Sequence, residues 1–134
     1  MTIRYAATHD LAWLQDQEEH VDSDTLRKKI GARELIIAQS ETELIGWLRY
    51  GFFWDEIPFM NMLFLIRAMR GRGIGRQLVE FWESEMRAKN YQLVMTSSQA
   101  NEDAQHFYRK LGYTDCGSFQ LPRQDLELIF CKSV

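Results

Sequence analysis

Apolar side chains recur every three or four positions in four segments of the chain, a spacing typical of amphipathic helices. The clearest pattern covers residues 73–89, where one face carries Ile74, Leu78, Phe81, Trp82 and Met86. Weaker patterns of the same kind predict helices over residues 9–18, 23–30 and 101–112. Residues suited to helix ends support these bounds: Thr8 and Asn101 can cap N-termini, and Gly31 fits the C′ position.

Stretches rich in apolar, β-branched and aromatic residues predict strands between these helices. They cover residues 3–7, 34–38, 44–54, 59–66, 92–97, 113–121 and 127–131. Asp55, Glu56 and Pro58 break the pattern between the third and fourth of these strands. Because helices and strands are mixed along the chain and strands outnumber helices, the sequence predicts an α+β fold with one central, mixed sheet.

Length and charge limit the classes of protein to consider. With 134 residues the chain has the size of one domain, so we expect a single domain over residues 1–134. The formal net charge of -3 argues against general nucleic-acid binding, which favours strongly basic domains. No apolar run is long enough to span a bilayer, and the N-terminus lacks the pattern of a secretory signal. These observations favour a cytoplasmic protein.

The two cysteines do not indicate a metal site. Cys116 and Cys131 have no His or Cys neighbours at metal-ligand spacing. In a chain without an export signal they are expected to be reduced, half-buried strand residues. No bound metal is expected.

One short segment has an unusual composition, because residues 67–76 read RAMRGRGIGR, with four arginines and three glycines. No Asp or Glu occurs from residue 57 to residue 79 to balance this charge. The segment lies where a predicted strand ends and the longest predicted helix begins. Glycines let the backbone turn tightly there, and the first helical turn adds unpaired N–H groups. Such a junction binds anions, and Arg70, Arg72 and Arg76 would add full charges around a phosphate.

The spacing of the glycines narrows the choice of phosphate ligand. A dinucleotide fingerprint requires a third glycine where this chain has Arg76, and a P-loop requires Gly-Lys before Ser or Thr. Neither pattern is present. The spacing that fits is R-x-x-G-x-G, from Arg70 through Gly73 to Gly75. In the alternative interpretation the glycines are turn residues only, and Arg72 is a solvated surface charge.

The segment Arg70-Gly71-Arg72-Gly73-Ile74-Gly75 resembles the acyl-CoA pyrophosphate loop of the GNAT superfamily of N-acetyltransferases. Downstream, NEDAQHFYRKLGYTDCGSF is similar to the family's later motif, N-x-x-A-x-x-F-Y-x-K-x-G-F/Y. The opening, IRYAATHDLAWL, resembles the family's first strand and helix. The resemblance implies a GNAT-like acyl-CoA N-acyltransferase fold with a single mixed, mostly antiparallel central sheet flanked by helices. It also implies acetyl-CoA as co-substrate.

The resemblance further implies roles for individual residues. Pantetheine would lie along the fourth predicted strand and pair with backbone groups near Leu63, Phe64 and Leu65. The N–H of Leu65 would polarise the thioester carbonyl at a bulge in that strand. Tyr108 would protonate the departing thiolate, although a tyrosine on an apolar helix face is by itself more typical of core packing. Asn101 would contact the cofactor, or would only cap its helix.

The group that removes a proton from the amine is harder to assign. Some family members carry a glutamate early in the acyl-CoA strand, whereas residues 59–66 of this chain contain no carboxylate. Asp55 and Glu56, immediately before that strand, are the nearest candidates and would act through water, unless they form an ordinary solvated turn. Together with Trp54 they could form an aromatic and acidic lip for a cationic, partly apolar amine.

The leading hypothesis is an N-acetyltransferase that transfers an acetyl group from acetyl-CoA to a primary amine of a small molecule or protein. We expect direct attack in a ternary complex, because neither Cys116 nor Cys131 has a sequence neighbour that would make it a nucleophile. The alternative is a non-catalytic acyl-CoA sensor or partner-binding module on the same fold, since the strand glutamate is missing. A homodimer is compatible with the resemblance, and no nucleic-acid or membrane partner is expected.

Overall fold

The computed structural model describes residues 1–134. The strands are β1 (Thr2–Tyr5), β2 (Leu35–Ser40), β3 (Glu43–Phe53), β4 (Ile57–Leu65), β5 (Leu93–Gln99), β6 (Thr114–Phe119) and β7 (Glu127–Ser133). The helices are α1 (Leu11–Gln17), α2 (Ser23–Gly31), α3 (Ile74–Ala88) and α4 (Ala104–Lys110). Two short 3₁₀ turns, η1 (Thr8–Asp10) and η2 (Arg67–Met69), precede α1 and follow β4. None of the helices has the length and apolar character needed to cross a bilayer.

The strands form one seven-stranded sheet in the order β1-β2-β3-β4-β5-β7-β6. The pairs β1–β2, β2–β3, β5–β7 and β6–β7 are antiparallel, whereas β4 and β5 pair in parallel. A parallel pair requires a crossover connection, and α3 lies in the segment that joins β4 to β5. The predicted α+β class, with a mixed and mostly antiparallel sheet flanked by helices, is therefore confirmed.

The chain forms two compact units. The first unit contains residues 1–50 and 62–82, and the second contains residues 51–61 and 83–134. Strands β3 and β4 and helix α3 each contribute residues to both units. No linker therefore separates the two units along these elements. The single domain over residues 1–134 stays a prediction.

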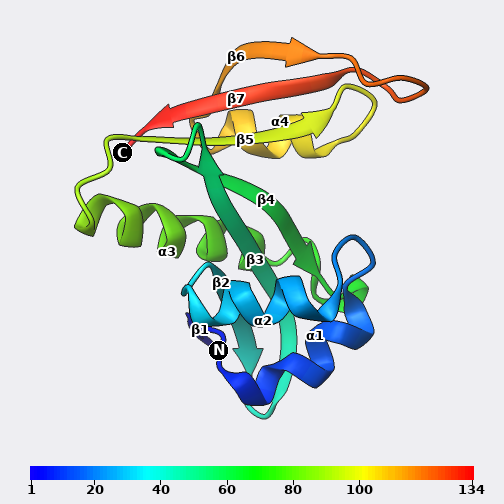
Figure 1. Cartoon of the computed structure of the whole chain (residues 1–134), viewed down its shortest axis with the longest axis vertical. Helices are drawn as coiled ribbons and strands as arrows, with labels where there is room; N and C mark the ends of the chain where they lie inside the picture. The colour runs from blue at the N-terminus through cyan, green and yellow to red at the C-terminus, as the bar shows by residue number, and fades with distance from the viewer. The chain divides into compact units, whose positions relative to one another are not determined.

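The core of the first unit joins α1 and α2 to the antiparallel strands β1, β2 and β3. Leu14 of α1 and Leu26 of α2 pack in one cluster with Leu35 and Ile37 of β2 and Trp47 of β3. Figure 1 shows α1 and α2 side by side, and the two helices contact each other. Strand β2 is buried on both faces, which accounts for its uninterrupted apolar sequence LIIA.

A buried ion pair holds the start of α1. The Asp10 side chain is 1% exposed and accepts hydrogen bonds from Arg4 Nη1 at 2.8 Å and Arg4 Nη2 at 2.9 Å. The same carboxylate accepts the backbone N–H of Ala7 at 2.7 Å. The prediction that Thr8 caps this helix is therefore wrong. Asp10, three positions after Ala7, reaches back to the free amide instead.

We expect the Asp10→Asn substitution to lower the free energy of unfolding by about 2 kcal/mol at pH 7, the usual worth of a charged hydrogen bond. Burial alone would raise the pKa of Asp10, but the hydrogen bonds from Arg4 and Ala7 outweigh it and lower the pKa. Because the folded pKa lies below the unfolded value of about 3.9, the stabilisation is complete above that value and is lost as pH falls through the folded pKa. Urea unfolding of both proteins at pH 7 and pH 2.5 measures this.

The matched control is Asp24→Asn, which removes an exposed Arg27–Asp24 pair at 2.8 Å. Exposed pairs contribute about 0–1 kcal/mol, so this change should be close to neutral at either pH. If the difference in free energy of unfolding between wild type and Asp10→Asn were the same at pH 7 and at pH 2.5, this result would contradict the lowered pKa of Asp10.

The second unit is built on β5, β7 and β6, which Figure 1 shows side by side, with α4 against β5. A buried polar network joins α3 to the end of the chain within this unit. Glu83 Oε2 accepts a hydrogen bond from the Tyr113 hydroxyl at 2.7 Å, and Glu83 Oε1 accepts one from Lys132 Nζ at 3.0 Å. Glu83 is 4% exposed, so Lys132 balances its charge in the interior. Burial and the neighbouring Glu83 raise the pKa of Tyr113.

Several boundaries differ from the sequence prediction for identifiable reasons. Gly31 is the last helical residue of α2 and not its C′ residue, because the left-handed conformation falls on Arg33, with φ of 57°. Pro58 was expected to break the strand pattern, but it is the second residue of β4, which continues from it to Leu65. Cys116 and Cys131 are free thiols as expected, but Cys116 is exposed and not half-buried, because β6 is exposed along its whole length.

Candidate functional site

The arginine- and glycine-rich segment forms a tight turn between β4 and α3, in the first unit. After η2, Gly71 and Gly73 adopt left-handed conformations with φ of 74° and 82°. A Cβ atom added to either glycine would meet nothing within 4 Å, so the backbone conformation, and not crowding, requires glycine here. Helix α3 begins directly afterwards at Ile74. The predicted strand–turn–helix junction is confirmed, and its use as an anion site stays a prediction.

The three arginines of this turn have different surroundings. Arg70 Nε donates a hydrogen bond to the carbonyl of Leu65 at 3.0 Å, and its guanidinium lies 5.7 Å from the centre of the Phe64 ring. These two contacts of Arg70 therefore connect the turn to the end of β4. Arg72 is exposed. Arg76 is also exposed and lies 3.9 Å from Glu80 one helical turn later, a weak surface pair that a phosphate can displace.

The predicted pantetheine strand is the C-terminal half of β4, where Leu63, Phe64 and Leu65 are all half-buried. Its position depends on Gly46 of β3, which the sequence analysis did not select. A Cβ atom at Gly46 would lie 2.5 Å from the Phe64 carbonyl oxygen and 2.5 Å from Leu65 Cδ2. The signal for this close approach was an isolated glycine inside a strand pattern, LIGWL.

Tyr108 lies on α4 in the second unit and is 6% exposed. Its ring packs against Phe107, Tyr113 and Phe130, with centroids 5.4, 5.9 and 6.0 Å away. Burial raises the pKa of Tyr108 to about 12, although a hydrogen bond with the Thr96 hydroxyl acts in the opposite direction. The phenol therefore stays protonated at neutral pH, where it can donate a proton but cannot act as a base.

Asn101 does not cap a helix. Helix α4 begins three residues later than predicted, and Asp103 stands at its N-cap position. The Asn101 amide instead donates a hydrogen bond to Asp125 Oδ2 at 2.8 Å. Asn101 therefore joins the turn before α4 to the loop between β6 and β7, and its cofactor role stays a prediction.

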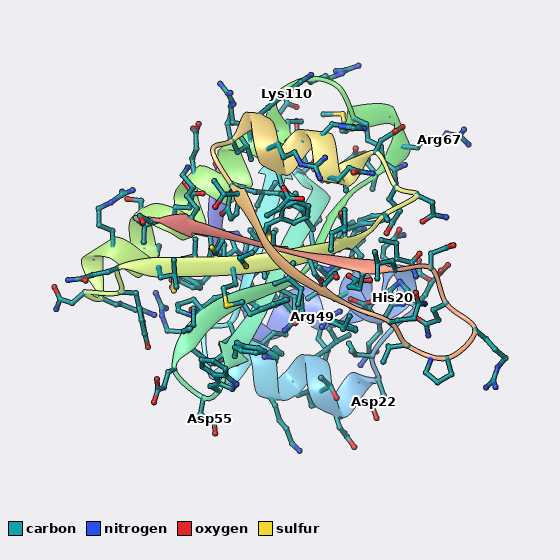
Figure 2. The ribbon with its side chains drawn as sticks, turned by 90° about the horizontal axis from the view of Figure 1, so that it is seen from above. His20, Asp22, Arg49, Asp55, Arg67 and Lys110 are labelled. Atoms are coloured by element: carbon teal, nitrogen blue, oxygen red, sulfur yellow. The ribbon has the colours of Figure 1, made fainter.

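Asp55 and Glu56 belong to the β3–β4 turn in the second unit. Trp54 and Asp55 have φ of 58° and 60°, and the Glu56 N–H donates to the Phe53 carbonyl at 3.1 Å. Two successive left-handed residues form the type I′ turn that suits the twist of a hairpin, here without the usual glycine. Trp54 is 74% exposed, and Figure 2 shows Asp55 at the outer end of the turn. The role of this turn as a lip for the amine stays a prediction.

The predicted site residues thus fall into two groups. Within the first unit, the Arg70–Leu65 hydrogen bond joins the glycine-rich turn to the predicted pantetheine strand. The second unit holds Tyr108, Asn101, Asp55 and Glu56. Among these four, Tyr108 is buried and the other three are exposed.

Comparison with known proteins agrees with the family resemblance of the sequence motifs. The profile of the Acetyltransferase (GNAT) family matches residues 5–113. No curated protein matches the chain by sequence.

Three solved structures illustrate the likeness in fold. Ard1 from Thermoplasma volcanium has a TM-score of 0.86 at 14% identity, covering 99% of this chain and 97% of that one. The ribosomal-protein-alanine N-acetyltransferase from Brucella melitensis has a TM-score of 0.81 at 22% identity, with 100% of both chains covered. The Salmonella typhimurium protein yncA, solved with acetyl-CoA, has a TM-score of 0.80 at 17% identity, covering 99% and 93%. At these identities the likeness establishes a shared fold.

Proposed function

The chain belongs to the Acetyltransferase (GNAT) family, and on that premise we propose that it transfers the acetyl group of acetyl-CoA to a primary amine of a small molecule or protein. The transfer takes place by direct attack of the amine in a ternary complex. Acetyl-CoA supplies an activated acyl carbon in a thioester.

One observation carries the proposal, namely the turn between β4 and α3. Gly71 and Gly73 hold left-handed conformations, and the space where a side chain would stand on either is open, which leaves room for a ligand beside the backbone of the turn. Arg72 and Arg76 add exposed positive charge beside the first turn of α3. These features fit a diphosphate, which accepts backbone hydrogen bonds and pairs with guanidinium groups.

Other residues take the roles that the family motif assigns to their positions. Backbone groups of Leu63, Phe64 and Leu65 hold pantetheine, and the Leu65 N–H stabilises the oxyanion that forms when nitrogen attacks the carbonyl carbon. As the C–S bond breaks, Tyr108 gives its hydroxyl proton to the sulfur. Asn101 contributes to cofactor binding from the turn before α4.

The attacking amine must first lose a proton, because a free alkylamine has a pKa of about 10.4. In this proposal Asp55 or Glu56 accepts that proton through water. Their support is the position of both residues in the turn immediately before β4 and the lack of any carboxylate from residue 57 to residue 66. The cytoplasmic location and a homodimer stay predictions.

Two measurements on the wild-type protein test the function. Isothermal calorimetry with CoA should give a saturable heat, and a thiol-release assay with acetyl-CoA should show turnover with at least one amine from a broad panel. Absence of heat with CoA would contradict the whole proposal. Tight CoA binding with no turnover for any amine would instead favour the sensor described above.

A further inference from the structure

Thr96 of β5 is a buried polar residue of the second unit to which the proposed function assigns no role. It is 1% exposed. In the register between β4 and β5 it stands opposite Met60, and its hydroxyl donates a hydrogen bond to the Met60 carbonyl at 3.0 Å. Met60 belongs to β4, the strand whose later residues are proposed to hold pantetheine. The Thr96 hydroxyl is therefore attached to the backbone of that strand.

Thr96 also contacts the proposed acid, Tyr108. In the sheet Thr96 pairs with Phe130 of β7, and the Tyr108 ring packs against Phe130 with centroids 6.0 Å apart. Helix α4, which carries Tyr108, contacts β5, as Figure 1 shows. The hydroxyl groups of Tyr108 and Thr96 are hydrogen-bonded to each other. One threonine hydroxyl thus contacts both the backbone of β4 and the group proposed to protonate sulfur.

The direction of the hydrogen bond between the two hydroxyls follows from the number of protons. A threonine hydroxyl has one proton and two lone pairs. Because Thr96 donates its proton to Met60, the Tyr108 hydroxyl is the donor and Thr96 the acceptor in the protein without substrates. To act as an acid, the Tyr108 hydroxyl has to turn its proton away from Thr96. Thr96 is then able to turn its own proton to the phenol oxygen.

This second arrangement favours the charge that forms on Tyr108. Tyr108 is 6% exposed, and burial together with the charge of Glu102 opposes a phenolate there. The nearby Tyr113 hydroxyl is already committed to Glu83. A hydrogen bond to the charged form favours ionisation of a buried group, and the bond with Thr96 acts in this direction on the pKa of Tyr108.

We propose that Thr96 is a positioning residue for the acid, because its hydroxyl holds the phenol oxygen of Tyr108 and turns its proton from the Met60 carbonyl to that oxygen as the C–S bond breaks. The Tyr108 proton goes to sulfur, which keeps the electron pair of the broken bond and leaves as the thiol of CoA. The phenolate regains a proton from solvent before the next turnover. This inference rests on the proposed function, since it requires Tyr108 to be the acid.

Two substitutions separate the hydroxyl of Thr96 from its shape. Thr96→Val keeps the branched side chain without the hydroxyl and should lower kcat about tenfold, with the KM for acetyl-CoA nearly unchanged. Thr96→Ser keeps the hydroxyl and should retain most of the kcat. The matched control is Thr114→Val in β6, which removes a hydroxyl that donates to the Cys131 carbonyl at 3.3 Å and should leave kcat unchanged. Equal losses of kcat in Thr96→Val and Thr96→Ser would overturn the inference.

The Tyr108→Phe background separates an effect through Tyr108 from an effect on β4. Thr96→Val also removes the hydrogen bond to Met60, so a displaced strand is the competing explanation for a lower kcat. Residues that act as a unit are not additive. Thr96→Val should therefore cause no further loss of kcat when Tyr108 is already phenylalanine. A loss by the same factor in both backgrounds would overturn the inference.

The ionisation of Tyr108 gives a readout that needs no catalysis. 3-Fluorotyrosine placed at position 108 has a more acidic phenol, and its ¹⁹F signal follows ionisation at a lower pH than tyrosine requires. The midpoint should rise by about one pH unit in Thr96→Val and stay unchanged in Thr96→Ser and Thr114→Val. Glu102, whose charge also acts on Tyr108, is present in every variant.

This titration also distinguishes failure of the inference from failure of the proposed function. Equal midpoints in wild type and Thr96→Val overturn the inference even if the protein acetylates amines. A midpoint that rises in Thr96→Val, in a protein that releases no thiol with any amine, supports the hydrogen bond from Thr96 to the phenolate and contradicts the proposed catalysis.

Discussion

The Tyr108→Phe protein should lose about 10²-fold or more of its kcat while its KM for acetyl-CoA stays nearly constant, since general acids usually contribute 10²–10⁴-fold. The substitution removes one hydroxyl and keeps the ring, so the packing with Phe107, Tyr113 and Phe130 persists. Burial raises the pKa of Tyr108 to about 12, so the hydroxyl is fully protonated at any ordinary assay pH. Rates of single turnover with a reactive amine measure the change.

The raised pKa of Tyr108 also restricts the stage of the reaction at which its proton can be transferred to sulfur. A free thiol has a pKa of about 8.5, so proton transfer from a phenol of pKa about 12 to a free thiolate is uphill by about 5 kcal/mol. Transfer therefore has to accompany C–S cleavage, when sulfur in a dry site is more basic than in water. A direct consequence is that kcat should show no falling limb from Tyr108 below pH 10.

Tyr113→Phe is the matched control for this prediction. It removes another buried hydroxyl of the second unit, one that donates to Glu83 at 2.7 Å. This variant should lose stability, because Glu83 is left with only Lys132 as a polar partner, but should keep most of its turnover. If Tyr108→Phe and Tyr113→Phe lose activity equally, the role of Tyr108 is structural.

Reversing both exposed arginines of the turn, Arg72→Glu with Arg76→Glu, should weaken CoA binding about 10²-fold. Charged hydrogen bonds are each worth about 1.5–3 kcal/mol, and exposure reduces this to roughly 1–1.5 kcal/mol per arginine. Two such losses correspond to about 10²-fold in Kd. The melting temperature should change little, because Arg76 forms only a weak pair with Glu80. Calorimetry with CoA at low and high salt measures the effect.

Two controls distinguish the loss of contacts with the diphosphate from a general effect of the change in net charge. Arg87→Glu with Arg123→Glu produces the same change in net charge at two other exposed positions and should leave CoA binding intact. Pantetheine lacks the diphosphate, so its weak binding should be the same in wild-type and reversed proteins. Equal weakening of CoA and pantetheine would show that the arginines act elsewhere than on phosphate.

Local patterns determined much of the fold. The recurrence of apolar residues over 73–89 located α3, since an amphipathic helix must bury one face wherever it packs. Glycines and arginines in residues 67–76 identified the turn before α3, because Gly71 and Gly73 require backbone conformations that other residues avoid. Helix ends were predicted less well. Competing side-chain contacts decide them, because Asp10 accepts the Ala7 N–H in place of Thr8, and the Asn101 amide donates to Asp125 and caps no helix.

By itself, therefore, the sequence determined the class of fold, the glycine-rich turn and the family, because each of these depends on residues close together in the chain. Only the tertiary structure decided what distant residues do to one another. It brought Gly46 against Phe64 and Leu65, buried Tyr108 deeply enough to raise its pKa, and paired Glu18 with Arg49 beside Trp47. Contacts between separate strands and helices leave no periodic signal in a single sequence, since any residue of suitable size and polarity satisfies the local pattern.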